Sequence, residues 1–277
     1  MYGAILGDMI GSPYEFGRGD KTKDFPLFDT GAGFTDDSVM TVAVADALME
    51  AQKQDSLADE QIVKDLLIDA MHKWGRRYPN AGYGGRFYQW LMTGSRQAYN
   101  SFGNGSGMRV SPAGWLSADL EEARRLARWS AEVTHNHPEG IKGAEAIASA
   151  VFLARTGHPK DTIREYVSEA FGYDLARTCD EIRPTYSFDV TCQGSVPEAI
   201  IAFLDGSDFE GVIRTAVSLG GDTDTIGAMA GSIAEAYYGV PDNLKQECEN
   251  RLSKDMLDVL VSMQNQYLNS ANMHSIR

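Results

Sequence analysis

Apolar residues recur at intervals of three and four along most of the chain, which is the spacing of one face of an α-helix. Over residues 58–77, for example, Ile62, Leu66, Ile68 and Met71 follow this period. The same pattern predicts further helices over residues 35–51, 117–135, 140–158, 159–172, 195–206, 208–221, 220–239 and 241–268. Alternating strand patterns are scarce, and only residues 185–195, TYSFDVTCQGS, predict a short extended segment.

Two of these predicted helices are expected to lie at the centre of the fold. Residues 143–154 and 226–236 are rich in Ala, Gly and Ser, which allow neighbouring backbones to approach closely. The glycine-rich tract Gly82–Gly114 is expected to be the longest irregular region, and long irregular regions are often functional. No low-complexity linker and no repeat of fixed period divides the sequence. The pattern therefore predicts one compact all-α domain over residues 1–277.

Composition is that of an ordinary globular protein and argues against one class of partner. Hydrophobic residues make up 43% and charged residues 23% of the 277 residues, so the chain can bury a substantial core. The formal net charge is -14, whereas a protein that binds nucleic-acid backbones needs a face of Lys and Arg. No nucleic-acid partner is expected. An anionic substrate would have to be held by metal ions, by backbone N–H groups or by a few local cations.

The cysteines and the N-terminal residues bear on the cellular compartment. Cys179, Cys192 and Cys248 form no CxxC pair and no even framework, which fits free thiols in a reducing compartment. The first stretch, MYGAILGDMIGSPYEF, is apolar in patches, but it has no basic leader and is interrupted by Asp8 and Glu15. It predicts neither a signal peptide nor a membrane span. A cytoplasmic protein without membrane contact is expected.

Two short acidic clusters stand at predicted helix starts, far apart in the chain. The first, TDDS, holds Thr35, Asp36 and Asp37, and the second, GDTDT, holds Asp222, Asp224 and Thr225. Carboxylates this close raise each other's pKa unless a cation neutralises them, and neither cluster has a Lys or Arg within four positions. Oxygen ligands without His or Cys favour Mg²⁺ or Mn²⁺, and such ligands can bridge two ions. The alternative is that the acids only cap their helices.

Other known motifs fit these residues poorly. An EF-hand that began at Asp222 would need an acid or amide at the fifth position and a Glu at the twelfth, where Ile226 and Ile233 stand. A DDxxD diphosphate site would need an acid at Met40. A phosphatase D-x-D nucleophile should follow a buried strand, whereas VIRTAVSLGG has helical character, so a phosphohydrolase is disfavoured but stays open. The GNGSG run is not GxGxxG after a strand and does not predict a Rossmann dinucleotide site.

Four sequence motifs occur in order between Gly3 and Gly239. They are GAILGDMIGSPYEF, FTDDSVM, FGNGSGMRVSPAGWL with the later VTHNHPEGIKGA, and SVPEAIIAFL with AVSLGGDTDTIGAMAGSIAEAYYG. Together they resemble the ADP-ribosylglycohydrolase family. The resemblance implies a single compact orthogonal domain of many helices, with a dinuclear Mg²⁺ or Mn²⁺ centre in a central cleft. It also implies cleavage of the bond that joins ADP-ribose to an acceptor.

The same resemblance assigns roles to individual residues. The implied ligands of two metal ions are Thr35, Asp36, Asp37, Asp222, Asp224 and Thr225. Glu15 aligns with a glutamate on a mobile loop near the metals, and it is the favoured proton-transfer residue, with Asp36 as the second candidate. The segment implied to cradle the diphosphate and distal ribose is Ser101, Phe102, Gly103, Asn104, Gly105, Ser106, Gly107 and Met108. Phe102 aligns with an aromatic residue that stacks on adenine, and His135 with a residue that contacts phosphate.

Several interpretations stay open from the residues alone. Glu15 could be a solvated loop acid, Arg109 either steadies its loop or contacts phosphate, and Tyr83 either lines the cleft or packs in the core. Some relatives sandwich adenine with a second aromatic residue before the GNG loop. Here that stretch is GSRQAYNS, so Arg96 or Tyr99 takes this place, or one face of the base stays open.

The expected function is a metal-dependent hydrolase that releases ADP-ribose from a modified protein side chain or a small conjugate. Arginine is the commonest acceptor in bacterial-type relatives and serine in another branch, and Glu15 within SPYEF looks more like the serine-type loop. One alternative is a non-catalytic, ADP-ribose-binding or crystallin-like member. The other is a metal-dependent phosphohydrolase that cleaves the diphosphate. The expected partners are ADP-ribose and ADP-ribosylated proteins, and the protein is expected to be a monomer.

Overall fold

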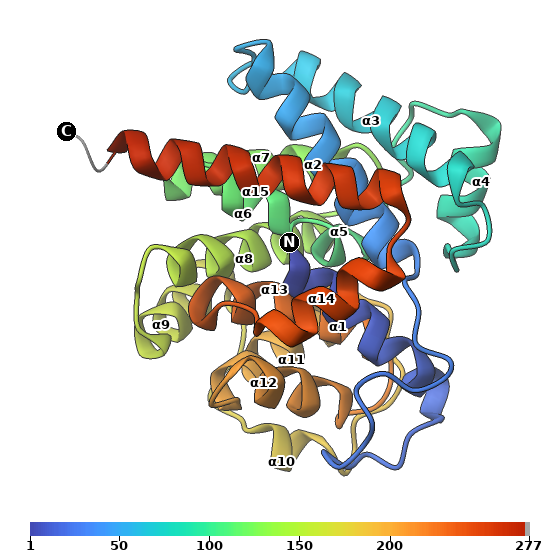
Figure 1. The fold of residues 1–277 in the computed structure, drawn as a ribbon, viewed down its shortest axis with the longest axis vertical. Coiled ribbons are helices and arrows are strands. Elements are labelled where there is room, and N and C mark those ends of the chain that lie inside the picture. The colour runs from blue at the N-terminus through green and yellow to red at the C-terminus, as the bar shows by residue number, and fades with distance from the viewer. Residues whose placement is uncertain (275–277) are drawn as a thin grey trace.

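The computed structural model describes the backbone of residues 1–274 and the side chains of residues 1–267, and its regular elements are helices (Figure 1). They are α1 (Tyr2–Gly11), the 3-10 segment η1 (Ser12–Gly17), α2 (Asp36–Lys53), α3 (Glu60–Arg77), α4 (Gly85–Thr93), α5 (Gly105–Met108), α6 (Ser111–Leu116), α7 (Leu120–Glu132), α8 (Pro138–Arg155), α9 (Lys160–Phe171), α10 (Cys179–Ile182), α11 (Cys192–Asp205), α12 (Phe209–Val217), α13 (Thr223–Tyr238), α14 (Asp242–Arg251) and α15 (Lys254–His274). Within the described residues there is no strand, so the predicted all-α fold is confirmed.

The centre of the fold is a close antiparallel pair formed by α1 and α13. Gly3 meets Gly231 and Gly7 meets Gly227, so the two backbones touch directly. A Cβ atom placed at Gly7 would lie 2.0 Å from the carbonyl oxygen of Gly227. All of α1 and the first three turns of α13 are buried. Because the helices run in opposite directions, the chain that leaves α1 lies beside the chain that enters α13.

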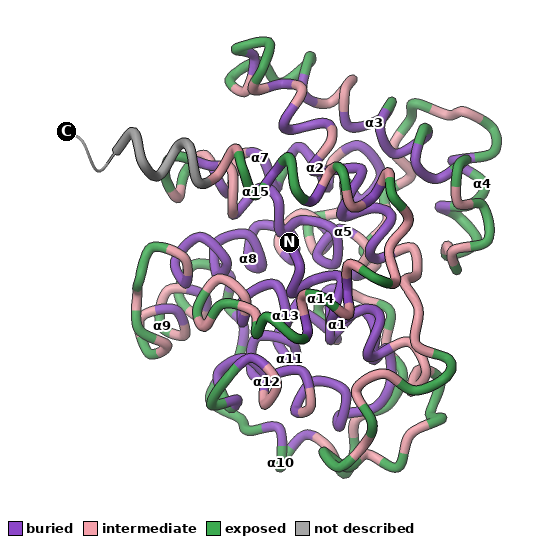
Figure 2. Tube along the Cα trace, viewed as in Figure 1, coloured by how far each residue is buried: buried purple, intermediate pink, exposed green. Residues whose placement is uncertain are grey.

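The other helices surround this pair. α8, α11 and α12 pack against α13, while α2 packs on α3 and α1 and is crossed by α15 (Figure 1). Figure 2 shows that burial is concentrated on the central helices, whereas α9, α10 and the loops near α4 mix buried, partly buried and exposed residues. Most of α8 is buried, as is the first part of α13, so the central positions predicted for the two small-residue segments are confirmed. None of the described helices has both the length and the apolar run that a bilayer crossing requires.

The glycine-rich tract Gly82–Gly114 is less irregular than the sequence predicts. It contains α4, α5 and most of α6. The high glycine content hides the apolar faces of these helices in the sequence. In α4 this face is formed by the buried side chains of Phe87, Trp90 and Leu91. The helix ends at Gly94, whose left-handed backbone, with φ of 67°, suits a glycine. The prediction holds only for the segments between these short helices.

Two other sequence-based boundaries also differ. The extended segment expected over residues 185–195 is reduced to one isolated bridge between Thr191 and Gly103, because α11 begins at Cys192. The helix expected over residues 241–268 is broken in two between α14 and α15.

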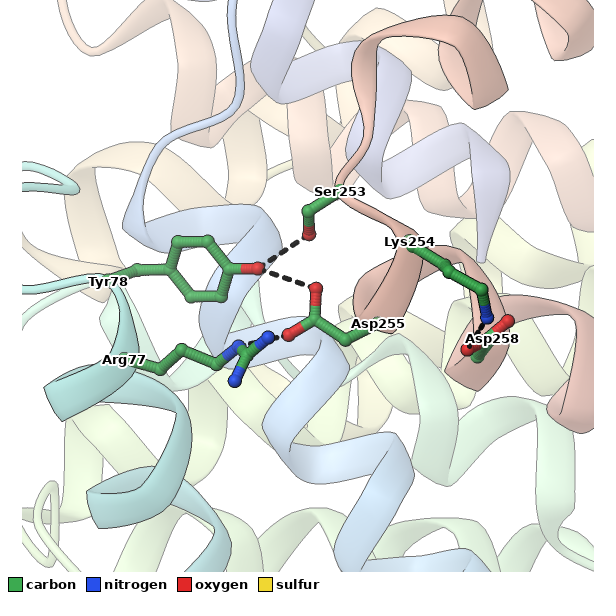
Figure 3. Close-up of a pocket in the computed structure, with 6 residues that line it drawn as sticks. All are labelled: Arg77, Tyr78, Ser253, Lys254, Asp255 and Asp258. Carbon is green, nitrogen blue, oxygen red and sulfur yellow. Dashed lines mark hydrogen bonds and ion pairs between the residues drawn. The ribbon is translucent and has the colours of Figure 1, made fainter.

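The break between α14 and α15 coincides with a polar contact to the end of α3. Figure 3 shows the hydroxyl of Tyr78 between Ser253 and Asp255, at distances of 2.5 Å and 2.8 Å. The guanidinium of Arg77 pairs with the same Asp255 carboxylate. These partners come from a distant helix, so the periodicity of the segment does not reveal the break.

Candidate active site and metal centre

A cavity of about 530 Å³ lies where η1, the starts of α2 and α13 and the segment around α5 meet. Most of the residues singled out in the sequence line it. They are Glu15, Thr35, Asp36, Asp37, Ser101, Gly103, Asn104, Gly105, Met108, His135, Asp222, Asp224 and Thr225. The cavity thus brings together residues from both halves of the chain.

The two acidic clusters meet across this cavity. The hydroxyl of Thr225 donates to Oδ2 of Asp37 at 3.3 Å, although the two residues are 188 positions apart in the chain. Glu15, Asp222 and Asp224 each present a carboxylate oxygen, and these oxygens lie within 4.8 Å of one another. The close packing of α1 on α13 accounts for this, because it places the segment of Glu15 beside the start of α13.

Helix capping explains only part of the two clusters. The side chain of Thr35 accepts a hydrogen bond from the backbone N–H of Asp37, as an N-cap residue does. Asp222 occupies the N-cap position of α13 but makes no side-chain cap bond. Oδ1 of Asp37 is buried and has no hydrogen-bond partner within the described residues. The carboxylates therefore have a ligating capacity that the helix ends do not use.

Asp8 is a buried acid of the site that the sequence analysis did not assign. Its carboxylate accepts from the backbone N–H and the hydroxyl of Thr35, both at 2.8 Å, and from the backbone N–H of Ser38 at 3.0 Å. The hydroxyl of Ser38 donates to it as well. Asp8 thus fixes the start of α2 against α1. Its signal in the sequence is a single acid within an apolar, glycine-spaced run.

The acids of the site repel each other. Burial raises the pKa of Asp36 to about 8, with further contributions from the charges of Asp8 and Asp222. Burial and the charge of Asp222 raise the pKa of Glu15 to about 7. The pKa values of Asp37 and Asp224 lie well above the ordinary range for the same two reasons, burial first.

A divalent cation would relieve this repulsion, and the donors present suit one. The acids and threonines offer only oxygen atoms, and the Oδ1 atom of Asp37 lacks any partner in the described chain. No Lys or Arg side chain forms an ion pair with Asp36, Asp37, Asp222 or Asp224 in the part of the chain that the structure describes. Hard oxygen donors of this kind fit Mg²⁺ or Mn²⁺.

The glycine-rich loop before α5 is tied to the second acidic cluster. The side-chain amide of Asn104 donates to Oδ2 of Asp222 at 2.7 Å and to the hydroxyl of Ser195 at 3.1 Å. The backbone N–H of Asn104 donates to the carbonyl oxygen of Val190 at 2.8 Å. Gly103 and Gly105 face the imidazole of His135. The loop is therefore held in place between the acids and His135.

Two cationic side chains line the cavity together with the acids. Arg109 is fully buried and lines the cavity. The sequence left open whether Arg109 steadies its loop or contacts phosphate, and this position is compatible with a ligand contact. Arg86, which the sequence analysis did not single out, also lines it, and its guanidinium lies 4.9 Å from the ring centroid of Tyr99. Tyr99 lines the cavity, whereas Arg96 pairs with acids of α3 on the surface. Of the two candidates for the second aromatic position, only Tyr99 is at the cavity.

Four further residues named in the sequence analysis lie beside the cavity and do not line it. The hydroxyl of Ser106 donates to the carbonyl oxygen of Gly140 at 2.7 Å, and Gly107 packs against Met229. Phe102 is 44% exposed and is not among the residues that line the cavity. Tyr83 packs against the hydrophobic core. Ligand contacts by Phe102, Ser106 and Gly107 stay predictions.

The mouth of the cavity carries an apolar rim that no sequence pattern indicated. Phe16, Phe188 and Val190 are exposed and line it. The ring centroids of Phe16 and Phe188 are 4.9 Å apart, so the segment that carries Glu15 packs on the loop before α11. Phe16 has a left-handed backbone with φ of 58°, which turns the chain immediately after Glu15.

Comparison with known proteins gives consistent matches over most of the chain. A sequence model of the family described as ADP-ribosylglycohydrolase matches residues 1–272. The ADP-ribosylhydrolase ARH3 of Homo sapiens is 28% identical over 338 residues, which cover 92% of this chain and 89% of that protein. The ARH3 protein of Mus musculus is 27% identical, with 92% and 88% covered. A solved structure of an ADP-ribosylglycohydrolase-related protein complex matches with a TM-score of 0.69 and 26% identity, over 96% of this chain and 95% of that one.

Proposed function

Because the chain belongs to the ADP-ribosylglycohydrolase family, we propose that it is a metal-dependent hydrolase that cleaves the glycosidic bond between ADP-ribose and an acceptor. The family match and the similarity to ARH3 proteins identify the chain as a glycosyl hydrolase. The observation that carries the proposal is the meeting of the two acidic clusters. The hydroxyl oxygen of Thr225 lies 3.3 Å from Oδ2 of Asp37, in a cavity that the glycine-rich loop also lines.

The proposed ligands of two divalent ions are the acids and threonines of both clusters, namely Thr35, Asp36, Asp37, Asp222, Asp224 and Thr225. Family members are metal-dependent, and the acidic group of this cavity has the donors that Mg²⁺ or Mn²⁺ prefers. When bound, such ions orient hydroxyl groups of the ribose and lower the pKa of a water molecule. Asp8 and Asn104 contribute by holding Thr35 and Asp222 in place.

Glu15 is proposed as the residue that transfers a proton at the scissile bond, with Asp36 as the second candidate. Glu15 is half-buried at the cavity, next to Asp222 and Asp224, on the segment that follows α1. Cleavage at an anomeric carbon needs a carboxylate that accepts a proton from the attacking water or stabilises the positive charge on the sugar. The packing of Phe16 on Phe188 keeps Glu15 at the mouth of the cavity.

The glycine-rich loop that lines the cavity is proposed to bind the diphosphate of ADP-ribose. Backbone N–H groups at Gly103 and Gly105 can come close to phosphate oxygens, because these positions carry no Cβ. His135, Arg86 and Arg109 line the same cavity. In this proposal the acids hold the metal ions, while the backbone N–H groups and these cations hold the diphosphate.

The test is a hydrolysis assay on defined conjugates. Purified protein is incubated with arginine-linked and serine-linked ADP-ribosylated peptides, with Mg²⁺ or with EDTA. Release of intact ADP-ribose from at least one peptide, lost in EDTA, is the expected result. Release of AMP would instead indicate a phosphohydrolase. Tight ADP-ribose binding without release from either peptide would indicate a non-catalytic protein and would contradict the proposal.

Metal binding predicts a change in thermal stability that does not depend on the substrate. At a Mg²⁺ or Mn²⁺ concentration of about 100 times Kd, binding stabilises the fold by about 2.7 kcal/mol, which raises Tm by roughly 5–10 °C. The Asp37→Asn variant is expected to lose most of this increase. Without metal, its Tm should not fall, because one of several mutually repelling buried charges has been removed.

The matched control is Asp24→Asn, which changes an exposed acid outside the cavity. Its response to metal should equal that of the unmodified protein in differential scanning fluorimetry. An Asp37→Asn variant that keeps the full increase would remove Asp37 from the metal centre.

One domain over residues 1–277, a monomeric state and a cytoplasmic location remain our proposals. The buried hydrophobic side chains form one cluster that extends from Met1 to Met263, which supports the single domain.

A further inference from the structure

A continuous chain of hydrogen bonds connects Arg109 to the imidazole of His135. Nη2 of Arg109 lies 2.8 Å from the hydroxyl oxygen of Thr134, and this oxygen lies 2.7 Å from Nδ1 of His135. Nη2 also donates to the carbonyl oxygen of Ser130 at 2.9 Å. Arg109, Thr134 and His135 are all buried, so water does not compete for these bonds.

The direction of these hydrogen bonds follows from the groups that can donate. A guanidinium can only donate, so the hydroxyl of Thr134 accepts from Arg109 and has one hydrogen of its own to place. Within the described residues, the only other hydrogen-bond partner of that hydroxyl is Nδ1 of His135. If Nδ1 carried a hydrogen, the hydroxyl hydrogen of Thr134 would be buried without an acceptor, which is unfavourable. Nδ1 therefore accepts, and the ring carries its hydrogen on Nε2.

Nε2 of His135 faces the glycine-rich loop. A Cβ atom placed at Gly105 would lie 3.1 Å from Nε2, and one placed at Gly103 would lie 3.5 Å from it. Burial, together with the charges of Arg109 and Arg86, holds the pKa of His135 well below its usual range. The imidazole is therefore neutral and presents one N–H group to the cavity.

We propose that Arg109 and Thr134 are positioning residues that fix His135 as a neutral Nε2–H donor to the diphosphate of ADP-ribose. The ligand in this inference rests on the proposed function, whereas the orientation of the hydrogen bonds does not. Arg109 and Thr134 do not touch the diphosphate in this arrangement. They act through the imidazole. As long as the hydroxyl of Thr134 donates to Nδ1, the hydrogen of the neutral ring stays on Nε2, so Nε2 remains a donor.

The charge of Arg109 supports an anionic ligand at this position. Within the described residues it forms no ion pair, and its Nε atom has no hydrogen-bond partner. A buried cation without a carboxylate partner is unfavourable unless an anion binds nearby. The cavity that Arg109 lines is where such an anion would bind.

The tautomer can be measured on the free, full-length protein. In ¹⁵N-labelled protein at neutral pH, long-range ¹H–¹⁵N correlation spectra distinguish Nδ1–H from Nε2–H rings. The chain has 5 histidines, so a His135→Gln variant assigns the signal. The expected spectrum shows His135 neutral and protonated on Nε2. In Thr134→Val, which removes the hydroxyl and preserves the side-chain shape, the ring should populate both tautomers, and Thr134→Ser should restore the Nε2–H form.

Calorimetry with ADP-ribose tests the ligand. Thr134→Val is expected to raise the Kd of ADP-ribose about tenfold, the effect of one misaligned hydrogen bond, with KM rising in parallel and kcat changing less than about twofold. The matched control is Thr156→Val, because the hydroxyl of Thr156 lies 3.0 Å from Nδ1 of His158 in a similar pair that does not line the cavity. This control should bind ADP-ribose as the unmodified protein does.

The two measurements separate the possible failures. A His135 ring protonated on Nδ1 in the free protein would overturn the proposed positioning, whatever the activity. The expected tautomer combined with unchanged ADP-ribose affinity in Thr134→Val would overturn the assignment of the ligand. Failure of the proposed function would appear differently, as absence of hydrolysis by the unmodified protein in which the tautomer is nevertheless as expected.

Discussion

The Glu15→Gln variant is expected to lower kcat by about 10²–10⁴-fold while the Kd of ADP-ribose changes little. Glutamine has the shape of glutamate but cannot accept a proton or carry a negative charge. If Glu15 transfers a proton at the anomeric carbon, its loss affects the transition state and not the binding of ADP-ribose. Initial rates with an ADP-ribosylated peptide, together with calorimetry, measure the two quantities separately.

Glu15 is also close enough to the acids to act as a metal ligand instead, and the variant distinguishes these roles. Its carboxylate, with those of Asp222 and Asp224, forms a group within 4.8 Å. A proton-transfer residue can be neutralised without loss of the metal-induced rise in Tm. If Glu15→Gln loses that rise as completely as Asp37→Asn does, Glu15 belongs to the metal centre and the proton-transfer role passes to Asp36.

The control for this variant is Asp24→Asn, an exposed acid on the same loop between α1 and α2. Asp24→Asn removes one negative charge, as Glu15→Gln does, but Asp24 does not line the cavity, so its kcat should be unchanged. A Glu15→Gln enzyme with the kcat of the unmodified protein would exclude both a proton-transfer and an electrostatic role for Glu15.

Local patterns in the sequence predict most of the fold. The helical period depends on which residues of one segment face the core, so it is visible without knowledge of the partner. For α3 the helix and the buried positions of Ile68 and Met71 are as predicted. The rest of the buried face differs, because Val63 and Leu67 are buried in place of Ile62, which is 39% exposed, and Leu66, which is partly buried. The two acidic clusters are equally local, since Asp36 with Asp37 and Asp222 with Asp224 each stand within a few positions at a helix start.

Features that depend on distant partners were not predictable in the same way. The sequence analysis did not predict α1, because its glycines weaken the helical signal and its buried faces point in all directions. Asp8 was seen only as an interruption of an apolar stretch, since its partners Thr35 and Ser38 belong to another helix. Arg86 and the rim formed by Phe16 and Phe188 likewise gain their positions from contacts between separate segments.

Of the substitutions discussed here, Gly7→Ala is expected to lower the free energy of unfolding the most. The new Cβ would lie 2.0 Å from the carbonyl oxygen of Gly227, and backbone atoms of a buried helix cannot move aside as a side chain can. Overpacking of this kind costs about 3 kcal/mol or more, which lowers Tm by roughly 6–12 °C. Helix propensity alone predicts the opposite sign, because alanine is favoured over glycine by about 1 kcal/mol.

Thermal denaturation of Gly7→Ala and of a control, Gly33→Ala, checks this prediction. A Cβ at Gly33 would meet no atom within 4 Å, so its Tm should be unchanged within the roughly 0.5 kcal/mol typical of surface substitutions. The folded fraction of Gly7→Ala should also bind metal more weakly, because Asp8 of α1 holds Thr35, and separation of α1 from α13 moves Thr35 away from Asp222. A Gly7→Ala protein as stable as the unmodified one would contradict the direct backbone contact between α1 and α13 from which the geometry of the site follows.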